Sequence, residues 1–381
     1  MWWLIPAIIL APLLANVLKW RRDLRRLRKL EASRTSISVH DLCRDQAPRV
    51  SFLVAAWNEE LTLDRCIESI LSLSYPSLEV VLCAGGTDRT WEIASRIIDP
   101  RLILIAQHPG DGKEMSLKRS LRHAAGEIVY LLDADCLITE DAFAQTLAPV
   151  LDGREQAVTS TPCLPLPEQL TVPFIVDQCA SRAYTSIWQP EYCSGVLGMN
   201  SAIRREALEQ AGGFGDVRTG GDYHLGKRLL RQGFRIRYEA VACFPTEFAA
   251  SLHSYLPQQA RWIRSVVVHG IRFCAYREVA SALLTSITGL AMLTLPLLAA
   301  FLALDPRVPG GIAEIAAAVW VTAFVYAFFS RLRYLKVADL WLGVRLPQRA
   351  LVLIPIFLLI DFLAWTIPLA EYPFKKLRER W

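Results

Sequence analysis

Two carboxylates follow an apolar run in the first half of the chain. Asp133 and Asp135 come directly after Ile-Val-Tyr-Leu-Leu at residues 128–132, a run typical of a buried strand. Open α/β sheets bind their ligands at the carboxyl ends of such strands. Two neighbouring carboxylates raise each other's pKa unless a cation lies between them, and hard oxygen ligands beside phosphate groups suit Mg²⁺ or Mn²⁺. The motif predicts a divalent metal site, although taken alone it fits equally well a helix-capping Asp next to a solvent-facing Asp.

A third carboxylate, Asp222, lies at the start of a predicted helix. It follows the glycine-rich turn Thr219-Gly220-Gly221. An Asp in this position is either a helix cap or, within hydrogen-bond reach of a hydroxyl group, a general base. Lys113 lies in a Gly/Asp/Lys turn upstream of the strand at residues 128–132. It either contacts an anionic ligand or faces solvent.

The elements that position these residues follow an alternating pattern. Apolar runs at residues 49–56, 78–83, 102–106 and 128–132 predict strands, and residues 61–73 carry apolar side chains at helical spacing. Strands that alternate with helices at this spacing imply a largely parallel sheet covered by helices. The following part is less regular, with an extended loop predicted at residues 161–173 and a helix near residues 204–210.

Both ends of the chain are strongly apolar. Residues 1–18, 279–304, 312–329 and 351–370 form runs close to the ~20 residues that span a bilayer. Basic residues follow the first run instead of preceding it, so it is interpreted as a membrane helix and not as a signal peptide. The basic cluster after it places the charged middle of the chain in the cytoplasm. A predicted basic loop at residues 331–349 agrees, whereas the basic tail at residues 375–380 would lie outside after four crossings. Either one run is interfacial or re-entrant, or the tail departs from the rule.

Cysteine and charge content exclude several classes of protein. The nine cysteines include no Cys-x-x-Cys pair, which indicates reduced thiols and no zinc site or disulfide framework. The net charge of +5 arises largely from the cluster after the first apolar run, which suits an anionic lipid surface. Nucleic acid is not an expected partner, because no aromatic and basic module accompanies the charge.

Taken in order, the motifs resemble the membrane-bound branch of glycosyltransferase family 2, which includes hyaluronan, chitin and cellulose synthases and ceramide glucosyltransferase. The resemblance covers residues 50–262. The motifs that carry it are Trp57-Asn58-Glu59-Glu60, Gly85-Gly86-Thr87-Asp88, Gly112-Lys113, Asp133-Ala134-Asp135, Gly212-Gly213-Phe214, Asp222 and Gln258-Gln259-Ala260-Arg261-Trp262. The resemblance implies a GT-A fold, an α/β nucleotide-diphospho-sugar transferase with a mostly parallel sheet, helices on both faces and additional transmembrane helices.

The resemblance also assigns roles to individual residues. Asp222 matches the catalytic base of an inverting transfer, and Asp135 matches the metal-holding carboxylate, with Asp133 beside it on the metal and the donor. The metal is Mg²⁺ or Mn²⁺, and a UDP-sugar is favoured over a GDP-sugar as donor. Further donor contacts are expected from Asn58, Glu59, Asp88 and Lys113. The acceptor and the diphosphate are expected to contact Gln258, Arg261 and Trp262.

Two positions depart from the family pattern. The second strand of the family usually ends in a pair of Asp residues, one of which reads the uracil of the donor, but Cys83 and Ala84 stand here. Asp88 or Glu59 could substitute for this contact, so the base of the donor stays open. The family commonly has Glu-Asp at the catalytic base, whereas here Gly221 precedes Asp222.

The sequence predicts five segments. They are a transmembrane helix (residues 1–18), a basic juxtamembrane linker (19–48), a cytoplasmic GT-A domain (49–256), an amphipathic interfacial helix with the QxxRW motif (257–278) and a C-terminal transmembrane region of about three apolar segments (279–381). The expected protein is a multi-pass enzyme of the inner (plasma) membrane.

The expected reaction is transfer of a sugar to a membrane lipid or lipid-linked acceptor. Alternatives are a processive polysaccharide synthase, which would need a homo-oligomer or a partner to export polymer, and a catalytically silent scaffold. Asp361, inside the last apolar run, is expected either to line an acceptor-side cavity or to lie near a membrane interface.

Overall fold

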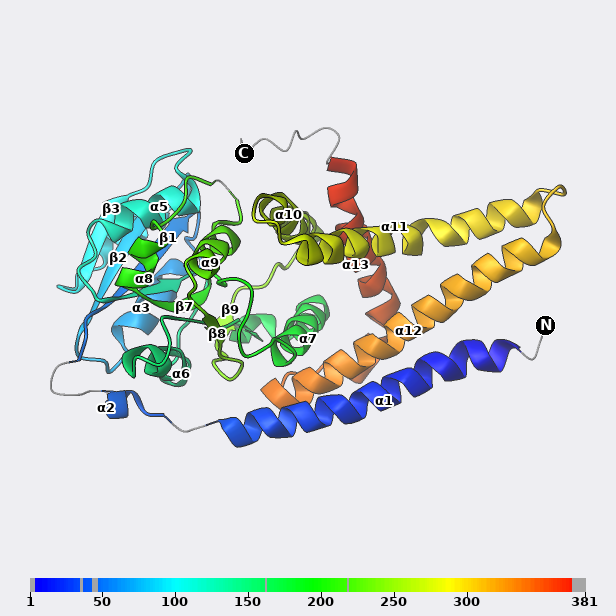
Figure 1. Ribbon diagram of the computed structural model, residues 1–381, viewed down its shortest axis with the longest axis horizontal. Coiled ribbons are helices and arrows are strands. Elements are labelled where there is room, and N and C mark those ends of the chain that lie inside the picture. Colours follow the sequence, from blue (N-terminus) through cyan, green and yellow to red (C-terminus); the bar gives the residue numbers. More distant parts are fainter. Residues whose placement is uncertain (1–3, 35–36, 43–46, 162, 218, 372–381) are drawn as a thin grey trace. The chain divides into compact units, whose positions relative to one another are not determined.

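The computed structural model describes the chain except for residues 1–3, 35–36, 43–46, 162, 218 and 372–381 (Figure 1). The described residues form two compact units. The first contains helices α1, α7 and α10–α13, and the second contains all the strands and the remaining α-helices. Each unit is described by itself.

The second unit is built on a seven-stranded sheet with the order β3-β2-β1-β4-β7-β5-β8. The strands β1 to β4 pair in parallel, and β7 runs antiparallel to its neighbours β4 and β5. The sheet strands are β1 (Val50–Trp57), β2 (Leu78–Gly85), β3 (Leu102–Ala106), β4 (Ile128–Leu132), β5 (Ala157–Thr159), β7 (Asn200–Arg204) and β8 (Ile236–Tyr238). A two-stranded sheet pairs β6 (Leu164–Pro165) with β9 (Pro245–Thr246). The mostly parallel sheet predicted from the sequence is confirmed.

Helices cover both faces of this sheet. Side chains alternate along a strand, so Phe52 and Val54 of β1 belong to one apolar layer, with α3 and α6, while Leu53 belongs to the other, with α5, α8 and α9. Burial on both faces explains why the central strands read as continuous apolar runs. The helices of this unit are α2 (Val39–Leu42), α3 (Leu63–Leu71), α4 (Thr90–Arg96), α5 (Gly112–Leu121), α6 (Glu140–Leu151), α8 (Arg205–Gln210) and α9 (Gly221–Arg231).

The first unit is helical. Its elements are α1 (Leu4–Ser33), α7 (Pro173–Ile187), α10 (Leu252–Arg272), α11 (Tyr276–Leu304), α12 (Gly310–Leu342), the 3₁₀ helix η2 (Gln348–Leu353) and α13 (Ile354–Glu371). Among the described residues, three segments are long and apolar enough to cross a membrane: Tyr276–Leu304, Gly311–Leu342 and Gln348–Glu371. They confirm the three predicted C-terminal apolar segments, whereas a membrane crossing by residues 1–18 stays a prediction.

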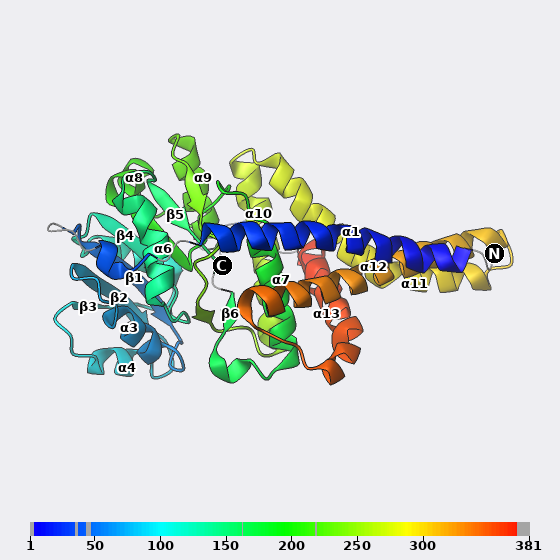
Figure 2. The same ribbon diagram turned by 90° about the horizontal axis from the view of Figure 1, so that it is seen from below.

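Helix α1 runs along α12, as Figures 1 and 2 both show. Polar contacts fix this pairing: Ser330 Oγ donates to Asn16 Oδ1 at 3.0 Å, and Arg333 Nη1 lies 2.5 Å from Asp23 Oδ2. Asn16 and Asp23 are buried, so the polar groups of α1 are paired inside the unit.

Two boundaries differ from the sequence prediction. The segment predicted as a basic loop from residue 331 is helical as far as Leu342, because the buried Arg331 and Arg333 pair with acidic residues of other helices. The predicted amphipathic helix begins at Leu252 and not at Pro257, because Ser251 and Ser254 form a capping box. The basic tail at residues 375–380 lies outside the described residues.

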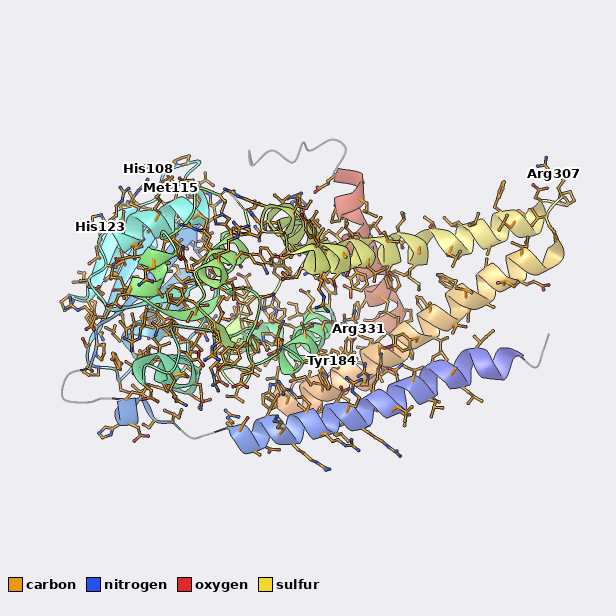
Figure 3. The ribbon with its side chains drawn as sticks, viewed as in Figure 1. His108, Met115, His123, Tyr184, Arg307 and Arg331 are labelled. Carbon is orange, nitrogen blue, oxygen red and sulfur yellow. The ribbon has the colours of Figure 1, made fainter. Side chains whose placement is uncertain are left out.

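Asp361 belongs to a group of buried charges that we term the buried ion cluster: Arg331, Asp177, Asp361 and Tyr255. Asp361 accepts a hydrogen bond from Tyr255 Oη at 2.6 Å and forms an ion pair with Arg331. Arg331 Nη1 also lies 3.4 Å from Asp177 Oδ2 of α7. Arg331, labelled in Figure 3, also donates a hydrogen bond to Ser181 of α7. Asp361 is therefore paired with Tyr255 and Arg331 inside the protein. The sequence analysis expected a cavity or a membrane interface at Asp361 and did not predict these partners.

Candidate active site

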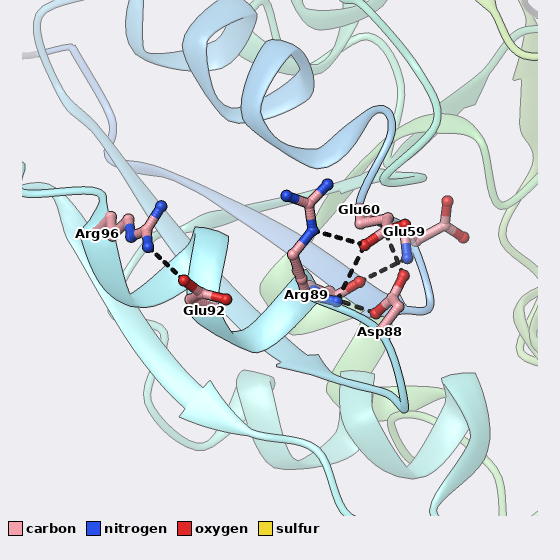
Figure 4. A network of polar contacts seen from close by, with 7 residues as sticks. Glu59, Glu60, Asp88, Arg89, Glu92 and Arg96 are labelled. Carbon is pink, nitrogen blue, oxygen red and sulfur yellow. Dashed lines mark hydrogen bonds and ion pairs between the residues drawn. The ribbon is translucent and has the colours of Figure 1, made fainter.

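The loops that follow β1 and β2 are tied together by polar side chains. Asn58 has a φ of 61°, a left-handed conformation that Asn tolerates, and its Oδ1 accepts a hydrogen bond from the Thr87 amide at 2.7 Å. The carboxylate of Asp88 accepts from the amides of Thr90 (3.0 Å) and Glu60 (3.2 Å), within the network of Figure 4. Burial alone would raise the pKa of Asp88, but these hydrogen bonds outweigh burial and lower that pKa. The side chains of Asn58 and Asp88 therefore accept hydrogen bonds from backbone amides of the two loops. Their contact with a donor stays a prediction.

Carboxylates crowd the end of β4. Asp133 and Asp135 follow its last residue, Leu132, and both are half-buried. Burial, followed by the charges of Asp135, Glu247 and Asp133, raises the pKa of Glu59 to about 8. Mutual repulsion of this kind is what a bound cation relieves.

The carboxylates at this edge fit a metal that a substrate shares. Within the described part of the chain, no group of three or more His, Cys, Asp or Glu side chains could hold a metal ion. A pair of carboxylates suits Mg²⁺, which is usually bound by one or two carboxylates together with substrate phosphates. Asp133 is paired with Lys113, which favours Asp135 as the residue that holds the metal. The donor set therefore fits the predicted cofactor.

Lys113 and Asp222 lie beside the same glycine. A methyl group at Gly198 would lie 3.1 Å from Cβ of Asp222 and 3.3 Å from Nζ of Lys113. Burial lowers the pKa of Lys113, but the charges of Asp133 and Asp222 outweigh it and raise the pKa, so the ammonium stays charged. The absence of a side chain at Gly198 lets the loop at residues 193–200 approach both groups.

Asp222 is the second residue of α9 and not its N-cap. The N-cap is Gly220, whose φ of 64° is left-handed. One carboxylate oxygen of Asp222 accepts a hydrogen bond from the Tyr223 amide at 2.7 Å. The structure brings together Asp222, Lys113 and Asp133 from α9, α5 and the end of β4.

Glu114 is a residue that the sequence analysis missed. It follows Lys113 on α5 and is only 7% exposed. Burial raises the pKa of Glu114 to about 7; Lys113 lowers it, while Asp222 and Asp133 add to the increase. An acidic residue in the first turn of a helix is ordinarily explained by the helix dipole, so the residue type gave no signal.

The end of β2 carries no carboxylate. Cys83 and Ala84 are fully buried in the strand. Nearby, Arg119 lies 3.0 Å from Asp111 and donates a hydrogen bond to the carbonyl oxygen of Ala106 at 2.8 Å. In the part of the chain that the structure describes, the eight cysteines form no disulfide bond.

The QxxRW motif lies on α10, in the first unit. Gln258 is half-buried, while Arg261 and Trp262 are exposed, with Trp262 at 37%. The Arg182 guanidinium lies 4.1 Å from the ring centre of Phe248 and 6.0 Å from that of Trp262. Trp262 is thus only partly covered, and its contact with an acceptor stays a prediction.

Comparison with known proteins identifies the family of this chain. The sequence model of the family described as "Glycosyltransferase like family 2" matches residues 48–265, more than half of the chain. The chain is 23% identical over 276 residues to a probable glycosyltransferase, YdaM, of Bacillus subtilis, a match that covers 68% of this chain and 60% of that protein. It is 24% identical over 231 residues to the poly-β-1,6-N-acetyl-D-glucosamine synthase of Staphylococcus aureus, covering 58% and 55% of the two chains. The matches thus span less than two thirds of either relative.

One solved structure resembles the fold along almost the whole chain. It is the mannosyltransferase PcManGT from Pyrobaculum calidifontis in complex with GDP-Man and Mn²⁺, with a TM-score of 0.50, 22% identity and coverage of 97% of this chain and 98% of that one. This likeness concerns the fold, which is GT-A as the sequence implied. On the family match, the chain belongs to glycosyltransferase family 2.

Proposed function

We propose that this protein is a membrane-embedded inverting glycosyltransferase that moves a sugar from a nucleotide-sugar donor to a lipid or lipid-linked acceptor. The observation that carries the proposal is the gathering of Asp222, Lys113 and Asp133 at one edge of the sheet. A base, a fixed cation and metal-binding carboxylates in one place are what transfer from a sugar diphosphate needs.

The proposed chemistry assigns one task to each group. Asp222 accepts the proton of the acceptor hydroxyl. That oxygen bonds to the anomeric carbon while the bond from this carbon to the diphosphate breaks on the opposite face, so the configuration inverts. Lys113 offsets negative charge near the donor. Asp135, with Asp133, would hold Mg²⁺ or Mn²⁺, which when bound supplies positive charge to the leaving diphosphate.

We assign roles to the remaining predicted residues as well. Asn58, Glu59 and Asp88 belong to the donor side, and Gln258, Arg261 and Trp262 contact the acceptor and the diphosphate. Arg261 would donate charge-assisted hydrogen bonds. The donor base stays open, since Cys83 and Ala84 replace the usual carboxylates. A UDP-sugar is the first candidate and a GDP-sugar the second.

The membrane assignment rests on the apolar helices. Three described segments have the length and composition to cross a bilayer, and basic residues follow the first apolar run of the chain. We therefore propose a multi-pass protein of the inner membrane, with the predicted domain at residues 49–256 in the cytoplasm. The basic residues after the first run would contact anionic lipids.

A second candidate is a processive polysaccharide synthase. It is favoured by the similarity to the Staphylococcus aureus synthase. The two candidates predict different products, a short glycolipid or a long polymer. A homo-oligomer would be expected only if polymer must be exported.

Product analysis separates these candidates. The purified protein in lipid vesicles is given radiolabelled UDP- and GDP-sugars with Mn²⁺ or Mg²⁺, and the products are separated by solvent extraction and by size. Label in one discrete extractable lipid supports the proposal. A ladder of high-mass polymer would replace it with the synthase, and donor binding without any transfer would favour a silent scaffold.

A further inference from the structure

Gly221, the residue before Asp222, has no room for a side chain. It is the first residue of α9, and its backbone is helical, without the positive φ of Gly220. Its conformation therefore does not require glycine. A Cβ atom at Gly221 would nevertheless lie 1.8 Å from both Cδ and Oε1 of Glu114. The Glu114 carboxyl group occupies the space that a side chain at position 221 would take.

Glu114 reaches this place from a different helix and is buried there. The residue is 7% exposed, and its Oε2 has no hydrogen-bond partner among the described residues. A buried polar atom without a partner is costly. Packing alone does not explain a carboxyl group here, because an apolar side chain of similar size would fill the space without this cost.

The groups that face Glu114 are those of the proposed site. Its electrostatic partners are Lys113 of its own helix, Asp222 of α9 and Asp133 after β4. Lys113 is paired with Asp133 and shares the contact at Gly198 with Asp222. The Glu114 carboxyl group is therefore close to both the proposed base and the proposed donor-side cation.

We infer that Glu114 is a positioning residue of the transfer site: its carboxyl group, occupying the side-chain space of position 221, sets the placement of Asp222 and Lys113. The inference rests on the proposed function, since it assigns Glu114 to the same site. The carboxyl group that the family pattern places directly before the base comes here from α5, and Gly221 is the residue that makes room for it.

An exchange of side chains tests this inference. Glu114→Ala is expected to lower kcat for transfer about 100-fold, the size of effect that small misplacements of reacting groups produce, with little change in the KM for the donor. Adding Gly221→Glu to Glu114→Ala returns a carboxyl group to the vacated space and should restore kcat to within about tenfold. The matched control, Glu114→Ala with Gly221→Gln, fills the same space without a carboxyl group and should not restore it.

Single substitutions complete the set. Gly221→Ala should lower kcat about as much as Glu114→Ala, because the added methyl group pushes the Glu114 carboxyl group aside. Added to Glu114→Ala, it should cause no further loss of kcat. Glu114→Gln keeps the volume and removes the charge, so it tests the carboxyl group even if the truncated variant folds poorly. Thermal midpoints and nucleotide binding report whether each variant is folded.

The outcomes separate the inference from the proposed function. Full activity of Glu114→Gln, or equal rescue by Gly221→Gln and Gly221→Glu, would overturn the positioning role while Asp222→Asn remained inactive. If Asp222→Asn were as active as the unmodified protein, the proposed function itself would fail. Rescue by Gly221→Glu alone, with Asp222→Asn inactive, supports both.

Discussion

Two groups of charged side chains, one in each unit, differ in exposure. In the buried ion cluster the side chains of Arg331, Asp177 and Asp361 are 5%, 2% and 8% exposed. At the edge of the sheet the side chains of Lys113 and Asp133 are 42% and 26% exposed. The buried carboxylates are both paired with Arg331, whereas the side chains at the sheet edge are exposed enough to contact a ligand.

This difference indicates what each group of charges is for. The buried ion cluster joins α7, α10, α12 and α13. Breaking a buried ion pair leaves an uncompensated charge and destabilises the fold, so we expect this cluster to stabilise the first unit. Burial raises the pKa of Asp177 to about 7, with Arg331 opposing the shift and Asp361 adding to it, which brings the cluster closer to neutrality. Exposed charges contribute little to folding, and the proposed function assigns those at the sheet edge to chemistry.

The largest effect is expected from the sheet edge. Asp222→Asn removes the proposed base and should lower kcat by about 10²–10⁴-fold, with the thermal midpoint unchanged. Asp216→Asn is the matched control, because Asp216 is an exposed carboxylate of the same region that pairs with Lys118 at 2.6 Å. Equal activity of the two variants in a transfer assay would contradict the role of Asp222.

The buried ion cluster should respond in the opposite way. Arg331→Met leaves Asp177 and Asp361 without their cation and should destabilise the protein by about 3–5 kcal/mol, measured as a lower thermal midpoint in detergent. Asp361→Leu should also lower the midpoint. If either variant folded normally and lost transfer activity, the cluster would belong to the site and the contrast between the two regions would fail.

A pH titration sharpens the comparison within the second unit. Glu114 has a folded pKa of about 7, above its ordinary value of 4.5, so the folded state binds more protons than the unfolded state between these values. Its contribution therefore lowers stability as the pH rises from 4.5 to 7, by on the order of 1–3 kcal/mol. Glu114→Gln should flatten this part of the curve of thermal midpoint against pH. An identical pH dependence in both proteins would show that the environment of Glu114 is not as described.

The smallest effect is expected from an exposed ion pair of the first unit. Arg307, labelled in Figure 3, is 88% exposed and lies 2.9 Å from Asp305. Exposed pairs contribute about 0–1 kcal/mol, so Arg307→Met should leave the thermal midpoint nearly unchanged. This variant is the control for Arg331→Met. A large fall in its thermal midpoint would show that exposed and buried ion pairs do not differ in their contribution to stability.

The sequence predicted best what local chemistry determines. The strands β1 to β4 were found because their apolar side chains are buried on both faces, and the carboxylates after β4 because they end such a strand. Helix α10 begins upstream of the predicted start, because the Ser251 cap precedes Pro257, which lies inside the helix. The basic end of α12 is helical and not the predicted loop, and the acidic partners of its arginines come from helices distant in the sequence.

The candidate site shows the same limit. Asp222, Lys113 and Asp133 were each proposed from motifs, but their proximity depends on Gly198 and on the packing of α5 against α9. Glu114 carries no motif of its own. Its position became evident only from the space that it takes beside Gly221, and one sequence does not contain that information.

The most direct measurement is the release of nucleoside diphosphate from a UDP- or GDP-sugar by the purified protein in lipid, with and without Mn²⁺. It is made on the unmodified protein, on Asp135→Asn and on Asp222→Asn. We expect release that requires the metal and is abolished in both variants, with nucleotide binding retained by Asp222→Asn. Release that is indifferent to the metal and to both substitutions would contradict a transferase site at the end of β4.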